Sequence, residues 1–177
     1  MTSDPRYPIG RFSYDGRATP EARRERIAQI AALPAALRHA VRRLTASQLD
    51  TAYRDGGWTI RQVVHHLPDS HLNAYVRFKL ALTEDTPTVK PYQEHRWAEL
   101  PDARTLAPEV SISLLEALHQ RWVALLSAME PAQWQRACHH PESNRVIPLD
   151  EALALYAWHG QHHVAQITSL RERQGWS

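Results

Sequence analysis

The sequence of 177 residues contains a single cysteine, Cys138, so no disulfide can form within the chain. Such cysteine usage is typical of the reducing cytoplasm, and the first ten residues show no apolar core of signal-peptide length. No run of 18 apolar residues is present, so we expect no membrane-spanning helix. We therefore predict a cytoplasmic protein without a membrane partner.

The chain also lacks a strong excess of charge of either sign. Lys and Arg number 21 and Asp and Glu number 19, which leaves a formal net charge of +2. This small surplus, without any run of Lys and Arg interleaved with aromatic residues, argues against a nucleic-acid partner. A glycine-rich phosphate loop, a G-x-S-x-G elbow and an H-E-x-x-H motif are all missing. The enzyme classes that depend on those motifs are therefore not indicated.

Four segments place apolar residues at steps of three and four, which predicts amphipathic helices over about 19–44, 59–82, 115–129 and 150–174. Thr59 and Gln62 form a capping box at the second start, and Asp150 is expected to cap the fourth helix. Gly175 lies just past the end of that helix, where glycine is favoured. No segment resembles a convincing strand. We predict an all-α four-helix bundle in a single domain over residues 1–177.

Two long connections interrupt the helical pattern. Residues 83–108 carry four prolines and little apolar periodicity, and residues 133–149 are expected to be irregular as well. A connection as long as 83–108 is unusual between helices and often forms a lid or a partner surface.

Histidine is frequent, at 11 of 177 residues. His159 and His163 are four residues apart, so their side chains stand on one helix face with Cβ atoms about 6 Å apart. At that spacing two imidazoles can hold one metal ion, and His65 or His66 in the second helix offers a third. Three histidine ligands would leave one position open for chemistry.

Two alternatives remain open at this point. His159 and His162, three residues apart, also share a helix face. The histidines also suit an ordinary packing role, in which their ring nitrogens bond to backbone groups or water.

Three further polar residues lie on the helical stripe of His66, namely Gln62, Asn73 and Arg77. They are candidate substrate contacts, although the same pattern is typical of a solvated helix face.

Long stretches of the chain resemble one family. They comprise Asp55 to Leu67, Asp69-Ser70-His71, Arg77 to Leu80, Lys90-Pro91-Tyr92, Trp97 to Leu100 and Trp158 to His163. On these motifs, which are spread over nearly the whole chain, the sequence is similar to the YfiT branch of the DinB superfamily.

The resemblance implies a four-helix bundle of the up-down-down-up type with long connections, a homodimer, and one zinc or nickel ion per subunit. By position, the family's three histidine ligands fall on His66, His159 and His163. Members are described as metal-dependent hydrolases, and related members as S-transferases that join a low-molecular-weight thiol such as bacillithiol to electrophiles. Pro68 departs from the family pattern.

Spacing and resemblance together predict a metal-dependent enzyme that activates water or a thiol for attack on a small electrophilic substrate. Imidazole suits zinc, nickel and other divalent ions, so the spacing does not select the metal. No residue is indicated as the general acid or base. The alternative prediction is a non-catalytic, metal-stabilised dimeric bundle that acts in a stress response. DNA binding, a third class, is disfavoured by the small net charge.

Overall fold

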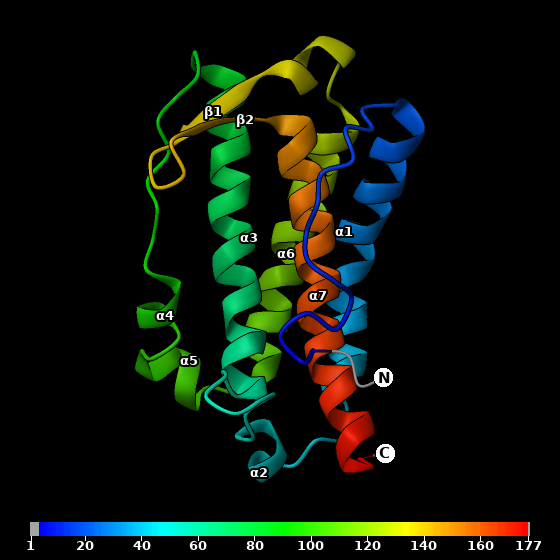
Figure 1. Cartoon of the computed structure of the whole chain (residues 1–177), viewed down its shortest axis with the longest axis vertical. Coiled ribbons are helices and arrows are strands. Elements are labelled where there is room, and N and C mark those ends of the chain that lie inside the picture. Colours follow the sequence, from blue (N-terminus) through cyan, green and yellow to red (C-terminus); the bar gives the residue numbers. More distant parts are fainter. Residues whose placement is uncertain (1–3, 177) are drawn as a thin grey trace.

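The computed structural model describes residues 4–176 of the chain. Four long helices, α1 (Pro20–Val41), α3 (Ile60–Thr83), α6 (Pro108–Ser127) and α7 (Leu149–Gln174), run side by side along the molecule (Figure 1). The α1 helix packs closely against α6 and α7, and α3 packs closely against α6, whereas α3 and α7 make less extensive contact. The predicted all-α four-helix bundle is confirmed, and its loosest seam lies between α3 and α7.

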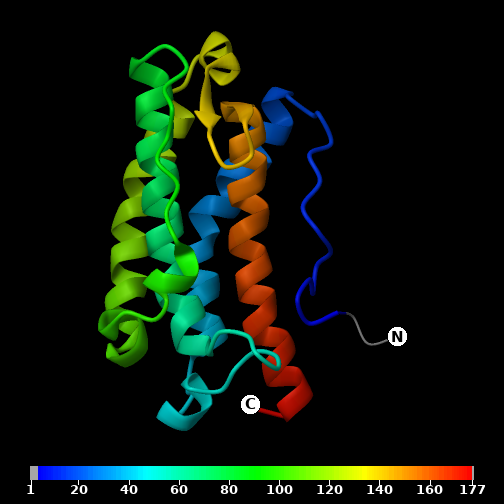
Figure 2. The same ribbon diagram turned by 60° about the vertical axis from the view of Figure 1, so that its left-hand side comes forward.

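The direction of each helix gives the predicted up-down-down-up order. In Figure 1, α1 and α7 run downward, whereas α3 and α6 run upward. Because α3 and α6 are consecutive and parallel, the chain must return along the whole bundle between them. Residues 84–107 make this return over the outside of α3 (Figure 2). The long connection is therefore a consequence of the helix order.

Two of the predicted helix caps are present in the structure, and one is not. Thr59 and Gln62 form both hydrogen bonds of the capping box before α3, and Gly175 ends α7 with a left-handed φ of 65°. The expectation that Asp150 caps α7 is wrong, because Pro148 occupies the cap position. Asp150 lies in the first turn instead, where its carboxylate forms a buried ion pair with Arg23 at 2.7 Å.

The connections contain more regular structure than the sequence indicated. The expectation that residues 133–149 are irregular is also wrong. This segment contains an antiparallel hairpin, with Cys138 opposite Ile147. Strands of four residues are too short to show a clear alternation of apolar and polar side chains. The additional elements are α2 (Ala46–Leu49), α4 (Glu94–Trp97), α5 (Pro101–Thr105), the 3-10 helix η1 (Pro131–Gln135), β1 (Ala137–His140) and β2 (Arg145–Pro148).

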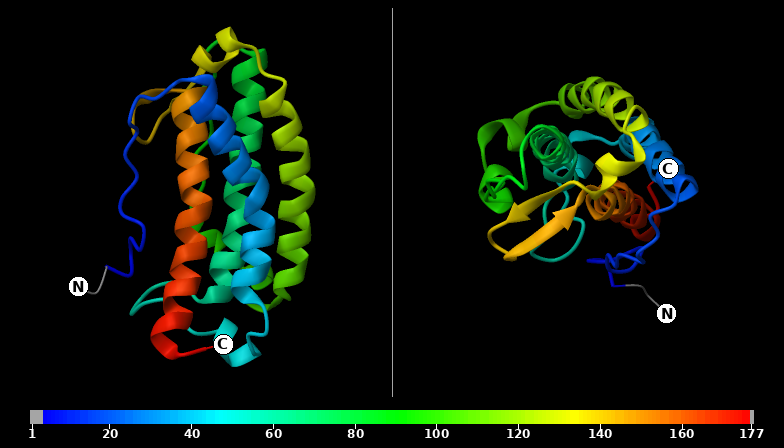
Figure 3. Two further views of the ribbon diagram at one scale, coloured as in Figure 1. Left: turned by 90° about the vertical axis from the view of Figure 1, so that its right-hand side faces the viewer. Right: turned by 90° about the horizontal axis from the view of Figure 1, so that it is seen from above.

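Two peripheral segments cover one end and one side of the bundle. The hairpin lies across the end at which α3 finishes and α7 begins, and residues 4–19 run along the outside of α7 (Figure 3). This arm contacts α7 through aromatic pairs, with Tyr7 against His162 and Phe12 against Trp158. Within residues 4–176, no helix is both long and apolar enough to cross a membrane.

The α1 and α7 helices approach each other closely at Gly160. A Cβ atom built at this position would lie 2.5 Å from Cδ2 of Leu33, closer than real Cβ contacts come, and 3.2 Å from its Cγ, which is tighter than most. Leu33 and Gly160 are both buried, so the leucine has no open space into which it can move. The absence of a side chain at Gly160 therefore sets how α7, and the histidines beside this glycine, sit against α1.

We predict that Gly160→Val lowers the free energy of unfolding by about 2 kcal/mol, because overpacking forces a backbone or rotamer shift. The double variant with Leu33→Ala should be less destabilised than the sum of the two single variants, since the second substitution removes the clashing atoms. Urea denaturation measures both effects. Gln161→Val at the exposed neighbouring position is the matched control, and an equal loss there would contradict the close approach.

Candidate metal centre

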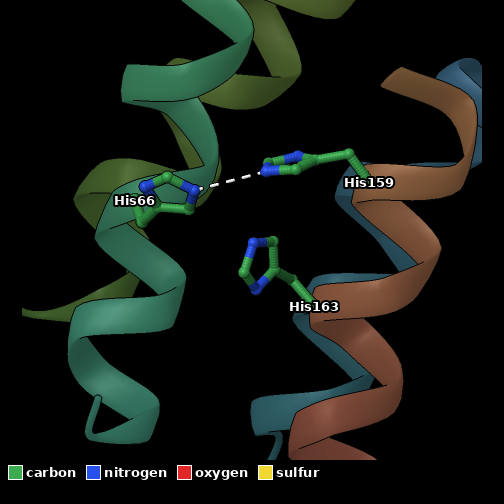
Figure 4. Close-up of side chains that lie close together, drawn as sticks. All are labelled: His66, His159 and His163. Atoms are coloured by element: carbon green, nitrogen blue, oxygen red, sulfur yellow. Dashed lines mark hydrogen bonds between the residues drawn. The ribbon is translucent and has the colours of Figure 1, made fainter. Parts of the chain in front are cut away.

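Three histidine side chains converge on the seam between α3 and α7. His66 comes from α3, and His159 and His163 come from successive turns of α7, and their rings point toward one another (Figure 4). One nitrogen of each lies within 4.8 Å of the others, and the Nε2 atoms of His66 and His159 are 3.3 Å apart. Two nitrogens that bind one tetrahedral zinc ion at 2.0–2.1 Å would be separated by about 3.3 Å.

The turn before α3 places His66 and one wall of the site. Residues 52 and 59 pair across this turn, and the backbone N–H of Tyr53 donates to the carbonyl of Trp58 at 3.0 Å. The capping box then starts α3 at Ile60, so His66 follows within two helical turns. The Trp58 ring lies 4.7 Å from His66 and 6.3 Å from His163, measured between centroids. Trp58 therefore shields one side of the cluster.

The ring nitrogen of His163 that faces away from the cluster has a polar partner. The side-chain oxygen of Gln166 accepts from Nδ1–H of His163 at 2.9 Å. The amide orientation of Gln166 is consistent with this role, because its Nε2 donates to the carbonyl of Arg6 in the N-terminal arm. With its proton on Nδ1, neutral His163 keeps a lone pair on Nε2.

His159 is held from behind by two further histidines. Its Nδ1 lies 3.2 Å from Nε2 of His71 on α3, and Nδ1 of His71 lies 2.9 Å from Nε2 of His119 on α6. Nδ1 of His119 contacts the backbone carbonyl of Ile30 on α1 at 2.7 Å. This chain of contacts crosses all four long helices.

Burial keeps the clustered imidazoles neutral. It lowers the pKa of His66 to about 3 and holds the pKa values of His159 and His163 well below the usual range. His66 and His163 are buried, whereas His159 keeps partial exposure toward the cavities described below. Three neutral imidazole nitrogens facing one small space form a donor set that fits a divalent cation such as zinc or nickel.

The structure decides two choices that the sequence left open, between His65 and His66 and between His162 and His163. His65 points away from the cluster, with Nε2–H donating to the carbonyl of Leu106 and Nδ1 bonded to the hydroxyl of Ser111 at 2.6 Å. His162 stacks on Trp158 with ring centroids 4.5 Å apart and is absent from the cluster. The geometry thus joins His159 with His163, four residues apart, and selects His66 over its neighbour.

Two cavities meet at the cluster. The first, here termed the Trp58 cavity, has a volume of about 380 Å³ and reaches all three clustered histidines. The second, termed the Arg77 cavity, has a volume of about 530 Å³ and opens beside His159. Glu94 and His95 of the 84–107 connection line both cavities, so this connection forms a shared wall.

Of the three predicted substrate contacts, one lines a cavity beside the cluster. Arg77 projects into the Arg77 cavity, where its guanidinium makes only long hydrogen bonds, at 3.4 Å to the Tyr156 hydroxyl and 3.3 Å to the Lys90 carbonyl. Gln62 is instead buried beneath the connection, with Nε2 donating to the carbonyl of Ala98 at 2.8 Å. Asn73 bonds to the preceding turn of α3 and lines neither cavity.

Several residues of the site were not singled out from the sequence. Gln166, His71 and His119 contact the clustered histidines or one another, and the connection supplies His95. His119 carried a signal that could have been used, because it lies one helical turn after Leu115 on the apolar stripe of its helix. A histidine at such a core position needs partners for both ring nitrogens.

Comparison with known proteins gives a consistent result. The family model described as the DinB superfamily matches residues 29–167. A Bacillus mycoides protein named "Putative metal-dependent hydrolase" is 55% identical over 173 residues, which cover 98% of this chain and 99% of the relative. A Bacillus subtilis protein named "Putative metal-dependent hydrolase YfiT" is 50% identical over 97% of this chain and 96% of its own length.

A solved structure agrees with the fold throughout. YfiT from Bacillus subtilis, described as "a probable metal-dependent hydrolase with an unusual four-helix bundle topology", superposes with a TM-score of 0.96 at 50% identity. The match covers 98% of this chain and 99% of that structure.

We predict a pH dependence of stability to which His119 contributes. Burial lowers its pKa from 6.5 to about 4, so the unfolded chain takes up this proton first as the pH falls. The stability linked to this shift, about 3 kcal/mol, is present above pH 6.5 and is lost progressively toward pH 4. In chelator-treated protein, His119→Gln should flatten the decline of the unfolding free energy between those limits, measured by urea denaturation. The exposed His39→Gln is the control, and unchanged slopes in both variants would refute the assignment.

Proposed function

The chain belongs to the DinB superfamily, and we propose that it is a metal-dependent hydrolase whose ion is held by His66, His159 and His163. The observation that carries this proposal is the convergence of three neutral imidazoles within 4.8 Å, beside two cavities. A divalent ion with three protein ligands and one open position acts as a Lewis acid and lowers the pKa of water. The names of the relatives, which describe metal-dependent hydrolases, support the same reaction class.

We propose that the Arg77 cavity receives the substrate. No carboxylate within residues 4–176 forms an ion pair with Arg77, although its guanidinium is only partly exposed. Glu94 and Glu142 line the same cavity but are exposed at its rim. An arginine with long, weak hydrogen bonds is available to bind a carboxylate or a polarised carbonyl of a small molecule.

The location of this cavity supports the assignment better than volume alone would. A larger cavity of about 760 Å³ lies between α1, α2 and the start of α6, and among residues 4–176 no cluster of ligating groups reaches it. The Arg77 cavity is smaller but contains His159, so a molecule bound there lies next to the cluster.

The nucleophile distinguishes the two versions of the proposed reaction. In a hydrolase water attacks the substrate, whereas in an S-transferase a low-molecular-weight thiol such as bacillithiol attacks. Assaying a model electrophile with and without bacillithiol separates them, because only hydrolysis proceeds without the thiol. The homodimer, the cytoplasmic location and the choice between zinc and nickel stay predictions.

We predict that His66→Ala and His159→Ala each remove both the bound metal and the hydrolytic activity, since each deletes one of three ligands. Metal content is measured on purified protein by elemental analysis, and turnover is measured with the same preparations. His39→Ala, at an exposed position on α1, is the control and should retain both. Activity that survives in His66→Ala with only a lower melting temperature would contradict the enzyme and favour a non-catalytic, metal-stabilised bundle.

We predict that Arg77→Met raises KM for a carboxylate-bearing ester by about 10-fold or more, because a charge-assisted hydrogen bond contributes about 1.5–3 kcal/mol. The effect on a neutral analogue of the same ester should be much smaller. Lys79→Met, exposed on the same helix, is the matched control and should leave both KM values unchanged. An equal rise in KM for the charged and the neutral ester would contradict binding of the substrate carboxylate by Arg77.

A further inference from the structure

We infer that His71 and His119 are positioning residues. Through hydrogen bonds in series from one backbone carbonyl, they fix the ring proton of His159 on Nδ1 and so hold its Nε2 lone pair toward the metal centre. The inference rests on the proposed function, because it assigns how one of the three ligands is prepared for the ion. The evidence is a continuous series of hydrogen bonds. In the first of them the donor and the acceptor are fixed, because one partner is a carbonyl oxygen.

The series begins at the carbonyl of Ile30 on α1. In a regular helix this oxygen accepts from the N–H four residues later, but that residue is Pro34, which has no N–H. The proline therefore leaves the carbonyl without its helical donor. Nδ1 of His119 lies 2.7 Å from this oxygen, and because a carbonyl only accepts, the proton sits on Nδ1.

Each later contact follows from the one before it. A neutral His119 with its proton on Nδ1 has a bare Nε2, so it must accept from Nδ1–H of His71 at 2.9 Å. His71 then has a bare Nε2, which accepts from Nδ1–H of His159 at 3.2 Å. The remaining nitrogen of His159, Nε2, carries a lone pair and lies 3.3 Å from Nε2 of His66.

The surroundings of the series favour neutral rings. His71 is 0% exposed and His119 is 2% exposed. The ring of Trp122 lies 5.7 Å from His71 and 6.0 Å from His119, and the ring of Tyr156 lies 5.5 Å from His71. An extra proton here would be a buried charge, and no carboxylate within residues 4–176 bonds to either ring.

The opposite polarity would harm the metal centre. If every ring carried its proton on the other nitrogen, a lone pair of His119 would face the Ile30 carbonyl, and N–H of His159 would point into the cluster. The first contact would be repulsive, and the second would block a ligand position. The contacts thus favour the tautomer of His159 that a cation requires before any ion arrives. Partners behind a ligand typically contribute 10- to 100-fold to metal affinity.

The first test reads the tautomers directly in metal-free wild-type protein. Nitrogen-15 NMR of the imidazoles distinguishes a protonated ring nitrogen from a bare one. We expect His71, His119 and His159 each to carry the proton on Nδ1. A proton on Nε2 of His119 or His159 overturns the inference, whether or not any variant folds.

The second test compares two substitutions at His119, which touches none of the three proposed ligands. The Gln side chain has an NH2 group that donates and an oxygen that accepts, so His119→Gln can donate to Ile30 and accept from His71. His119→Leu removes both groups and leaves Nδ1–H of His71 without an acceptor. We expect His119→Leu to weaken Zn²⁺ affinity by about 10-fold or more, with His119→Gln close to wild type. Competition with a chromophoric chelator at pH 7.5 measures the affinity.

Controls separate this inference from the proposed function. Circular dichroism and thermal melting of the metal-free variants establish that the fold is retained. Equal affinities for His119→Leu and wild type, or equal losses in the Leu and Gln variants, would contradict the inference. If wild-type protein binds neither Zn²⁺ nor Ni²⁺, the proposed function fails, while the NMR result still decides the tautomers.

Discussion

A buried imidazole must find a partner for each of its two nitrogens, and this constraint organises the centre of the bundle. His159 and His163 use Nδ1 to bond to protein groups, respectively His71 and Gln166. Their Nε2 atoms are then left facing His66 across the seam between α3 and α7. Their Nε2 lone pairs therefore point into one small space beside Nε2 of His66, where either an N–H of His66 or a cation can meet them.

The helix order explains why the 84–107 connection lies beside the histidine cluster. Since α3 and α6 run in the same direction, residues 84–107 must travel back along the bundle, and they do so over α3. Gln62 anchors this return through the carbonyl of Ala98, and the return contributes Glu94 and His95 to both cavities. The cavities at the loosest seam of the bundle are thus partly walled by the connection that the topology requires.

The support for the ligands comes from elements far apart in the sequence. The N-terminal arm orients Gln166, while α1, α6 and α3 each supply one member of the series behind His159. Pro34, unfavourable inside a helix by the usual propensities, frees the carbonyl at which that series begins. The histidine cluster on two helices therefore depends on the assembly of all four.

Helical periodicity and local hydrogen bonding act over a few residues, so the sequence alone predicts the four long helices, the caps at Thr59 and Gly175, and histidines that share one face of the last helix. Similarity to a family indicated His66 and the helix order. The folded chain alone reveals that Gln62 anchors a connection, that Asp150 pairs with Arg23, and that short strands form near Cys138. Only the fold, too, brought His71 and His119 behind His159. Most of these features depend on which helix faces meet, and residues distant in the sequence meet only when long-range packing is complete.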